Sequence, residues 1–272
     1  MLLKKYSLII PAVLLVILVL TALFAPYLTP HDPFAQDLDN RFMCPCRAYL
    51  MGTDDLGRCI FSRLVLGTRV SLLIGVAVVS INTIIGTLVG LISGFGHKII
   101  DSIIMGIIDI LLAFPGAILT LAVAGILGPG LLNMIIALTV LGWVSYARFV
   151  RGMVLSLKER EFVESARCLR FGNVHILFKH ILPNCLGPIV VLSSMDMAGV
   201  ILMAAGLSFL GLGVQGSFPE WGLMLNQGKD YLRIAPHLAT CPGLAIMVAA
   251  LAFNLLGDGL RDLLQGEGVH FN

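Results

Sequence analysis

Residues 70–95 have the sequence VSLLIGVAVVSINTIIGTLVGLISGF and contain no Asp, Glu, Lys or Arg. A helix needs about 20 mostly apolar residues to cross the hydrocarbon core of a bilayer, so this stretch predicts a transmembrane helix. Within it, Gly86, Gly90 and Gly94 form a repeated GxxxG pattern, which is typical of closely packed membrane helices. This segment alone therefore indicates an all-α membrane protein.

The composition of the whole chain agrees with this interpretation. Of its 272 residues, 58% are hydrophobic and 12% are charged, whereas roughly a quarter of the residues in soluble domains are charged. The net charge of +2 is too small to predict a nucleic-acid partner. The 6 cysteines show neither a CxxC motif nor a finger-like spacing with histidine, so neither a zinc finger nor a disulfide framework is predicted.

Further apolar windows predict about six transmembrane helices in total. The predicted spans are Leu8–Ala25, Val70–Phe95, Ile103–Ala124, Leu131–Tyr146, Cys185–Leu210 and Leu238–Leu256. The first follows Lys4 and Lys5, as in a signal peptide, but it is longer than the usual h-region and no AxA site follows it, so a retained helix is predicted. The chain then divides into three parts. These are an N-terminal anchor helix (1–28), an external segment (29–69) and a core transmembrane domain (70–272).

The distribution of Lys and Arg predicts the sidedness. With the N-terminus inside, eleven of the 18 Lys and Arg residues lie on the cytoplasmic side and seven lie outside. This bias favours a cytoplasmic N-terminus under the positive-inside rule. Because an even number of spans returns the chain to the same side, we expect the C-terminus to be cytoplasmic as well.

The long polar connection at residues 148–184 is the most distinctive segment. It holds seven Lys or Arg and three Glu, a net charge of 7 − 3 = +4, and a simple positive-inside loop is one interpretation. However, Phe162, Ala166 and Leu169 share one helical face, and residues 171–173 (FGN) predict a turn before a second amphipathic stretch. Two short helices joined by a turn predict a compact knob that suits docking into the groove of a partner.

This connection resembles the EAA coupling loop in permeases of binding-protein-dependent, ATP-driven importers. The matching residues are Glu164, Ser165, Ala166, Gly172, His180 and Pro183. Other blocks resemble the dipeptide, oligopeptide and nickel branch of that family, on the expected external side, and include Gly52, Asp54, Gly57, Arg58 and Trp221. The resemblance implies a type I ABC importer permease in the cytoplasmic membrane of a bacterium or archaeon.

The resemblance also implies the partners. They are a homologous second permease, two ATPase subunits that bind ATP and Mg, an external substrate-binding protein and membrane lipid, with no nucleic acid. The chain has no GxxxxGK[ST] motif, so it is expected to bind no ATP or other cofactor and not to be an enzyme. Gly211, Gly213 and Gly216 match GxGxxG but follow a predicted membrane helix rather than a strand, so no nucleotide site is predicted.

Two positions depart from the family pattern. The glycine expected six residues after Glu164 is Arg170, which indicates that the turn of the knob has shifted to Gly172. The residue after Gly57-Arg58 is Cys59 instead of the family's Asp. Cys59 and the pair Cys44 and Cys46 are expected outside. We interpret them as incidental cysteines, with a soft-metal relay as the alternative.

Asp109 and Asp196 lie within predicted spans, where an ionised carboxylate must face protein, a partner or water. Both are candidates for the translocation path, and the alternative for each is a carboxyl that is hydrogen-bonded at a helix contact. The surroundings of Asp196 resemble the nickel branch, so nickel or a metal chelate is the predicted cargo, with Asp196 as a transient ligand. A dipeptide or oligopeptide is the alternative cargo, and an ion-coupled secondary transporter is a remote third interpretation. Trp221 is predicted to be an interfacial anchor.

Overall fold

The computed structural model describes residues 2–266, with side chains described for residues 9–264. Within this range the chain is helical, apart from one bridge between Thr53 and Cys59 and the connecting loops. Lys4 and Lys5, which the predicted sidedness uses, lie outside the described side chains. Residues 267–272 of the predicted core domain lie outside the described residues.

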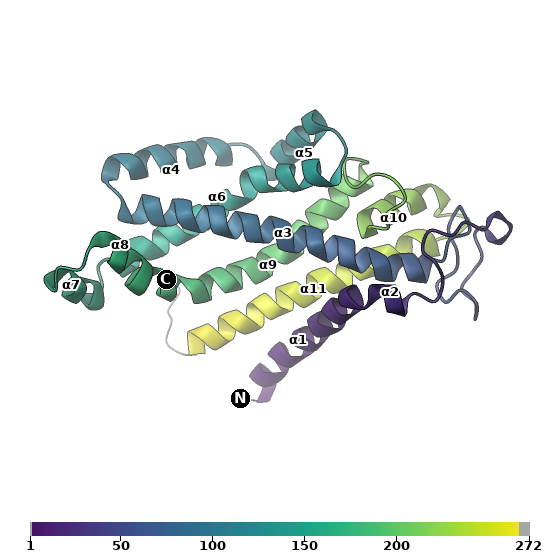
Figure 1. Cartoon of the computed structure of the whole chain (residues 1–272), viewed down its shortest axis with the longest axis horizontal. Helices are drawn as coiled ribbons and strands as arrows, with labels where there is room; N and C mark the ends of the chain where they lie inside the picture. Colours follow the sequence, from purple (N-terminus) through teal and green to yellow (C-terminus); the bar gives the residue numbers. More distant parts are fainter. Residues whose placement is uncertain (1, 267–272) are drawn as a thin grey trace.

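Four helices among the described residues are long and apolar enough to cross a membrane. They are α3 (Ile60–Phe95), α6 (Leu131–Leu157), α9 (Leu182–Phe209, preceded without a break by α8, Asn173–Ile176, and η2, Leu177–Ile181) and α11 (His237–Gly266). They lie side by side along the long axis of the molecule (Figure 1). The all-α membrane fold is therefore confirmed.

The N-terminal helix α1 (Leu2–Leu23) lies against α11 and α3, and the short helix α2 (Ala25–Leu28) follows it. Pro11 lies inside α1, nine residues after its start, and removes one i→i−4 hydrogen bond from the helix because it has no N–H. The described apolar part of α1, Ile9–Leu23, is shorter than the four long helices. The end of α1 at Leu2 and the end of α11 at Gly266 point toward the same end of the bundle (Figure 1).

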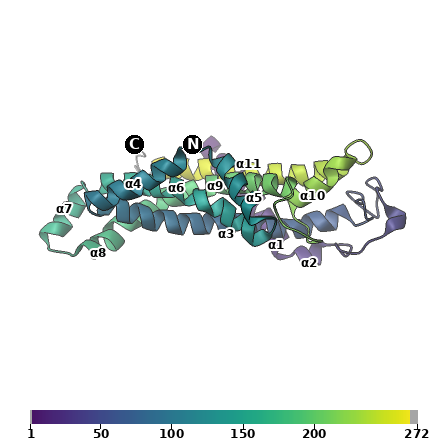
Figure 2. The same ribbon diagram turned by 90° about the horizontal axis from the view of Figure 1, so that it is seen from above.

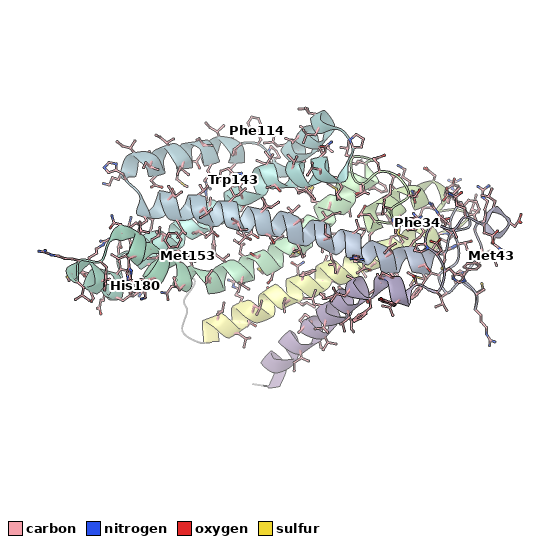
Figure 3. All side chains as sticks on the ribbon, viewed as in Figure 1. Phe34, Met43, Phe114, Trp143, Met153 and His180 are labelled. Carbon is pink, nitrogen blue, oxygen red and sulfur yellow. The ribbon has the colours of Figure 1, made fainter. Side chains whose placement is uncertain are left out.

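The predicted third span, Ile103–Ala124, is not one straight helix. It consists of α4 (Lys98–Leu112) and α5 (Gly116–Leu127), which are bent by 84° relative to each other. Pro115 explains the break, because it has no N–H and disfavours a helical conformation of the residue before it. Phe114 lies at this break on the outer side of the bundle (Figure 3). Together with the four long helices, this bent pair makes at most five spans that pass the same test in the described chain.

Two helices are longer than the hydropathy windows predicted. α3 begins at Ile60 instead of Val70, and α6 continues to Leu157 instead of ending at Tyr146. The extensions contain charged residues that an apolar window excludes, among them Arg63 and Arg151. Each of these two arginines is paired with a carboxylate in the structure, so the helix can include it.

The α3–α6 contact is the closest helix packing in which the glycine repeat takes part. A Cβ added at Gly90 would lie 2.7 Å from both the carbonyl oxygen of Ala147 and the Cβ of Val150. One added at Gly94 would lie 2.7 Å from the Cβ of Val154. The prediction that this repeat mediates close helix contact is confirmed.

The polar parts of the chain lie at opposite ends of the bundle. At one end, α7 (Glu161–Cys168) and α8 form the predicted knob. At the other end lie the segment that contains η1 (Leu38–Asn40), and the elements α10 (Trp221–Gly228) and η3 (Lys229–Tyr231). Both views show the knob and this external segment separated by the full length of the helices (Figure 2).

The glycine repeat gives a testable prediction. We expect Gly90→Val to lower the stability of the folded chain by about 1–3 kcal/mol, because the new side chain overpacks the seam between two backbones. Gly152→Ala, on α6 with no atom within 4 Å of the added Cβ, is the control and should change stability by less than about 1 kcal/mol. Thermal unfolding in detergent measures both, and equal melting temperatures for the two variants would contradict the proposed seam.

Candidate functional site

The knob packs on the ends of α3 and α6 through one face of α7. Val163 and Ala166 are buried in a cluster with Val150 and Val154 of α6 and Leu91 of α3. Ile176, Ile181 and Cys185 complete this cluster from the following helical segment. The knob is therefore rigidly seated on the transmembrane helices and does not hang from them as a loop.

The opposite side of the knob exposes apolar side chains. They are Phe162, Leu169, Phe171, Val174 and Phe178. Phe162, Ala166 and Leu169, which the sequence predicted to share one helical face, differ in exposure: Ala166 is buried, whereas Phe162 and Leu169 are exposed. The packed face follows the i, i+3 pair Val163 and Ala166 instead, which leaves the larger residues free to contact a partner.

The turn of the knob lies at Arg170, not at Gly172. Arg170 has φ +59°, in the left-handed region that favours glycine. The amide of Phe171 donates to the carbonyl of Ala166 (3.2 Å) and the amide of Arg170 donates to that of Arg167 (2.9 Å). This pair of bonds is the Schellman motif that ends many helices, with its glycine position occupied by Arg170.

Gly172 has an extended conformation (φ −68°, ψ 152°) and directly precedes α8. Any residue can adopt these angles, so the prediction that the turn had shifted to Gly172 was wrong. The backbone of the knob keeps the family's turn position although the residue there has changed.

Aromatic rings lie together after the turn. Phe171 stacks on His175 with ring centroids 4.6 Å apart, and His175 and His180 are 5.8 Å apart. The next turn, η2, is a π-turn, in which the amide of Leu182 donates to the carbonyl of Leu177. Pro183 follows at the start of α9 and has no N–H to donate, which favours such a local change in helix register.

Glu164 and Ser165 are exposed on α7. Glu164 lines an open hollow together with Lys158, Glu159, Arg167 and Cys168. The structure therefore brings Glu164, Ala166, His180 and Pro183 into one knob. In it, Glu164 and Pro183 face outward, Ala166 is packed inside, and His180 lies half-buried beside Phe171.

The external motif forms a buried ionic cradle. Oδ1 of Asp54 accepts hydrogen bonds from the amides of Leu56 (3.0 Å) and Arg58 (2.9 Å), and Oδ2 accepts from Nε of Arg58 (2.7 Å). Gly57 has φ +75°, and any Cβ there would collide with the backbone of Asp37. Asp54, Gly57 and Arg58 are thus brought together to shape this loop.

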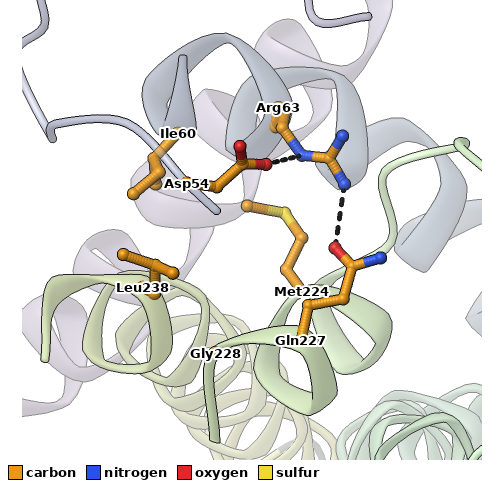
Figure 4. Close-up of a pocket in the computed structure, with 7 residues that line it drawn as sticks. All are labelled: Asp54, Ile60, Arg63, Met224, Gln227, Gly228 and Leu238. Carbon is orange, nitrogen blue, oxygen red and sulfur yellow. Dashed lines mark hydrogen bonds and ion pairs between the residues drawn. The ribbon is translucent and has the colours of Figure 1, made fainter. Parts of the chain in front are cut away.

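Arg63 extends the cradle into the helices. Its Nε lies 3.5 Å from Oδ2 of Asp54, and its Nη2 donates to Oε1 of Gln227 on α10 (3.2 Å; Figure 4). Gly52 has φ +79° and lies against His237 at the start of α11. The sequence predicted no pairing of Arg63 with Gln227. Their distance of 164 positions along the chain leaves no local pattern that could reveal the pair.

Trp221 is part of the core and not an interfacial anchor as predicted. Its side chain is 1% exposed, and its Nε1 donates to the carbonyl of Leu64 on α3 (3.2 Å). Glu220 caps α10 by accepting from the amides of Gly222 and Leu223, both at 2.8 Å. The sequence predicted neither α10 nor this cap, although an acidic residue directly before a helix is a typical N-cap signal.

Asp196 lies at a contact between α6 and α9. Its Oδ2 accepts a hydrogen bond from the buried hydroxyl of Tyr146 (3.0 Å). One turn away, the hydroxyls of Thr83 and Ser193 are 3.0 Å apart. This geometry fits the alternative interpretation of Asp196, a carboxyl bonded at a helix contact. Among the described residues, no group of three or more His, Cys, Asp or Glu could hold a metal ion.

Asp109 does not share the surroundings of Asp196. It forms an ion pair with Arg148 on α6, and both side chains are largely exposed. Cys44 and Cys46 are exposed, Cys59 is buried, and none of the three forms a disulfide. The predicted candidates thus form a knob at one end, a cradle at the other and two separate carboxylates between them.

Comparison with known proteins places the chain among transport proteins. Residues 86–266 match the family model described as "Binding-protein-dependent transport system inner membrane component". Residues 2–45 match the "N-terminal TM domain of oligopeptide transport permease C".

Full-length relatives are similar over most of the chain. The di/tripeptide transport system permease protein DppC of Pseudomonas aeruginosa is 42% identical, over 92% of this chain and 85% of the relative. The glutathione transport system permease protein GsiD of Pectobacterium atrosepticum is 44% identical, over 97% of this chain and 88% of the relative.

The fold also has solved counterparts. An inward-facing structure of the MetNI methionine ABC transporter superposes with a TM-score of 0.60 at 20% identity, covering 75% of this chain and 97% of that chain. At this identity the likeness concerns the fold alone.

The turn of the knob gives a second prediction. We expect Arg170→Gly to stabilise α7 by about 1 kcal/mol, because glycine adopts the left-handed conformation without the cost that a side chain adds. Gly172→Ala, in an extended conformation, should leave α7 unchanged. Hydrogen exchange of the α7 amides measures both effects. If the α7 amides lose protection from exchange in Gly172→Ala and gain none in Arg170→Gly, the turn lies at Gly172 and the prediction is wrong.

Proposed function

Because this chain belongs to the family of binding-protein-dependent transport system inner membrane components, we propose that it forms one half of the translocation path of an importer for short peptides. It is a permease subunit of the ABC importer family and not an enzyme. ATP and Mg belong to the partner ATPases. The observation that carries the proposal is the match over nearly the whole chain to permeases named for peptides and glutathione.

The cargo is where this proposal departs from the cargo predicted from the sequence. Nickel or a metal chelate was favoured there, and a dipeptide or oligopeptide was the alternative. The names of the relatives support the alternative, since glutathione is itself a short peptide. The hydrogen bond from Tyr146 to Asp196 also offers a structural role for the carboxylate that had suggested a transient metal ligand.

The knob is the proposed docking site for an ATPase subunit. It projects beyond the ends of the long helices (Figure 1), its outer side exposes apolar side chains beside the charged hollow around Glu164, and its inner side is packed on α3 and α6. Exposed apolar side chains outside a membrane favour binding to a protein groove. A push on the knob would be transmitted directly to the packed helices.

The remaining partners follow from the same family. We propose a homologous second permease beside this chain, two ATPases at the knob end and a substrate-binding protein at the cradle end. The knob end would be cytoplasmic, and the ends of α1 and α11 on that side support cytoplasmic termini. An ion-coupled secondary transporter remains the competing function, and ATP dependence separates the two.

The transport function can be tested in proteoliposomes. The chain alone should take up neither alanyl-alanine nor Ni²⁺. Together with its second permease, ATPases and binding protein, it should accumulate alanyl-alanine only when ATP is inside. Concentrative uptake by the chain alone would overturn the importer role, and ATP-driven uptake of Ni²⁺ instead of peptide would restore the metal cargo.

Glu164 tests the docking role of the knob. Glu164→Lys reverses the charge in the hollow that Lys158 and Arg167 also line, and we expect ATPase co-purification or peptide uptake to fall at least tenfold. Glu161→Lys changes the same charge one turn earlier on α7, outside that hollow, and is the matched control. If Glu164→Lys retains wild-type uptake and co-purification, docking does not involve this side of the knob.

A further inference from the structure

The ion pair between Asp109 and Arg148 is unusual for its exposure. Its side chains are 65% and 52% exposed, respectively. A second ion pair joins the same two helices: both terminal oxygens of Asp101 accept from Arg151, at 2.5 and 2.6 Å, and these side chains are only 21% and 28% exposed. We call Asp109–Arg148 the open pair and Asp101–Arg151 the covered pair, because their side chains differ in exposure.

The open pair lies deep within the membrane-spanning part of the chain. Along α4, the distance from Lys98 at the knob end to Asp109 is about 16 Å. Along α6, the distance from Arg148 to the knob end at Leu157 is about 14 Å. α4 runs alongside α3 and α6 (Figure 1), so these lengths approximate depth. The pair therefore lies about 15 Å inside the knob end of the bundle, within helices that are long and apolar enough to cross a membrane.

An open ion pair at this depth is incompatible with a lipid-facing surface. Charged side chains within a membrane face protein or a water-filled cavity, because lipid does not compensate their charge. On α4, Ile108 is buried against α6, and Asp109 and Ile107 flank it on either side. Asp109 therefore marks a flank of α4 that cannot face lipid, beside the face that is buried against α6.

The break between α4 and α5 lies close to the open ion pair. α4 ends at Leu112, within one turn of Asp109. The last carbonyl groups of a helix receive no hydrogen bond from an N–H group of the same helix. In a bilayer such a break is tolerated where protein or water satisfies the freed groups. Broken helices near the midplane are also where transporters bind their substrates.

We propose that Asp109 and Arg148 form a transient binding site for the charged termini of a zwitterionic substrate in a water-filled path. This proposal rests on the peptide-importer function above. The guanidinium of Arg148 can donate hydrogen bonds to the carboxylate of the substrate, and the carboxylate of Asp109 can accept them from its ammonium group. Since the residues also pair with each other, each substrate charge replaces an existing partner. Binding is then weak enough for release.

Charge removal tests the site. Asp109→Asn with Arg148→Gln removes both charges while retaining polar side chains, so neither residue is left as an unpaired charge. We expect this double variant to assemble and hydrolyse ATP normally but to import alanyl-alanine about tenfold more slowly, as expected when charged hydrogen bonds are lost. Asp101→Asn with Arg151→Gln, which neutralises the covered pair, should import normally per assembled complex. Wild-type import by the first double variant would overturn the site.

Labelling tests whether water reaches the site. In a chain whose native cysteines are replaced by serine, Asp109→Cys should react with a charged, water-soluble maleimide in the assembled complex. Ile107→Cys, at the same depth on the other flank of α4, should not react. If Asp109→Cys does not react and the second permease no longer co-purifies, the ion pair lies at a contact between the two permeases. That result would contradict the proposal. Failure of the wild-type complex to import any peptide would overturn the proposed function itself.

Discussion

The close approach of α3 and α6 is the contact on which the rest of the structure depends. Gly90 and Gly94 have no side chain to hold the helices apart, so Val150 and Val154 of α6 lie directly against α3. The same two valines form the floor on which the knob packs. The seam inside the membrane and the seat of the knob outside it are therefore one continuous packing unit.

α3 also connects the two ends of the molecule. Near its start, Arg63 joins the buried carboxylate of Asp54 and reaches α10 through Gln227. Near its other end, Leu91 belongs to the cluster that holds the knob. A helix that is fixed at both ends couples the cradle at one end of the bundle to the knob at the other by geometry alone.

Much of this could be predicted from local patterns, because apolar length, glycine spacing and charge bias are properties of single segments. The remainder depends on contacts between distant segments. α3 starts early because Arg63 pairs with Asp54, and Trp221 is buried because a carbonyl of α3 accepts its N–H. The break at Pro115 could have been anticipated from its ring. The turn at Arg170 could not, because its residue type argues against its conformation.

The continuity of α8, η2 and α9 has a mechanical consequence. Together they form a helix of 37 residues, which is a rod of about 55 Å. A rod of this length that tilts by about 10° around its centre moves each tip by about 5 Å in opposite directions. Pro183 and Pro188 lie in the half of the rod nearest the knob, where bending concentrates. The part of the rod beyond Pro188 thus behaves as a stiff lever that can bend near the knob. A small displacement at the knob end of the rod then becomes an opposite displacement at its other end.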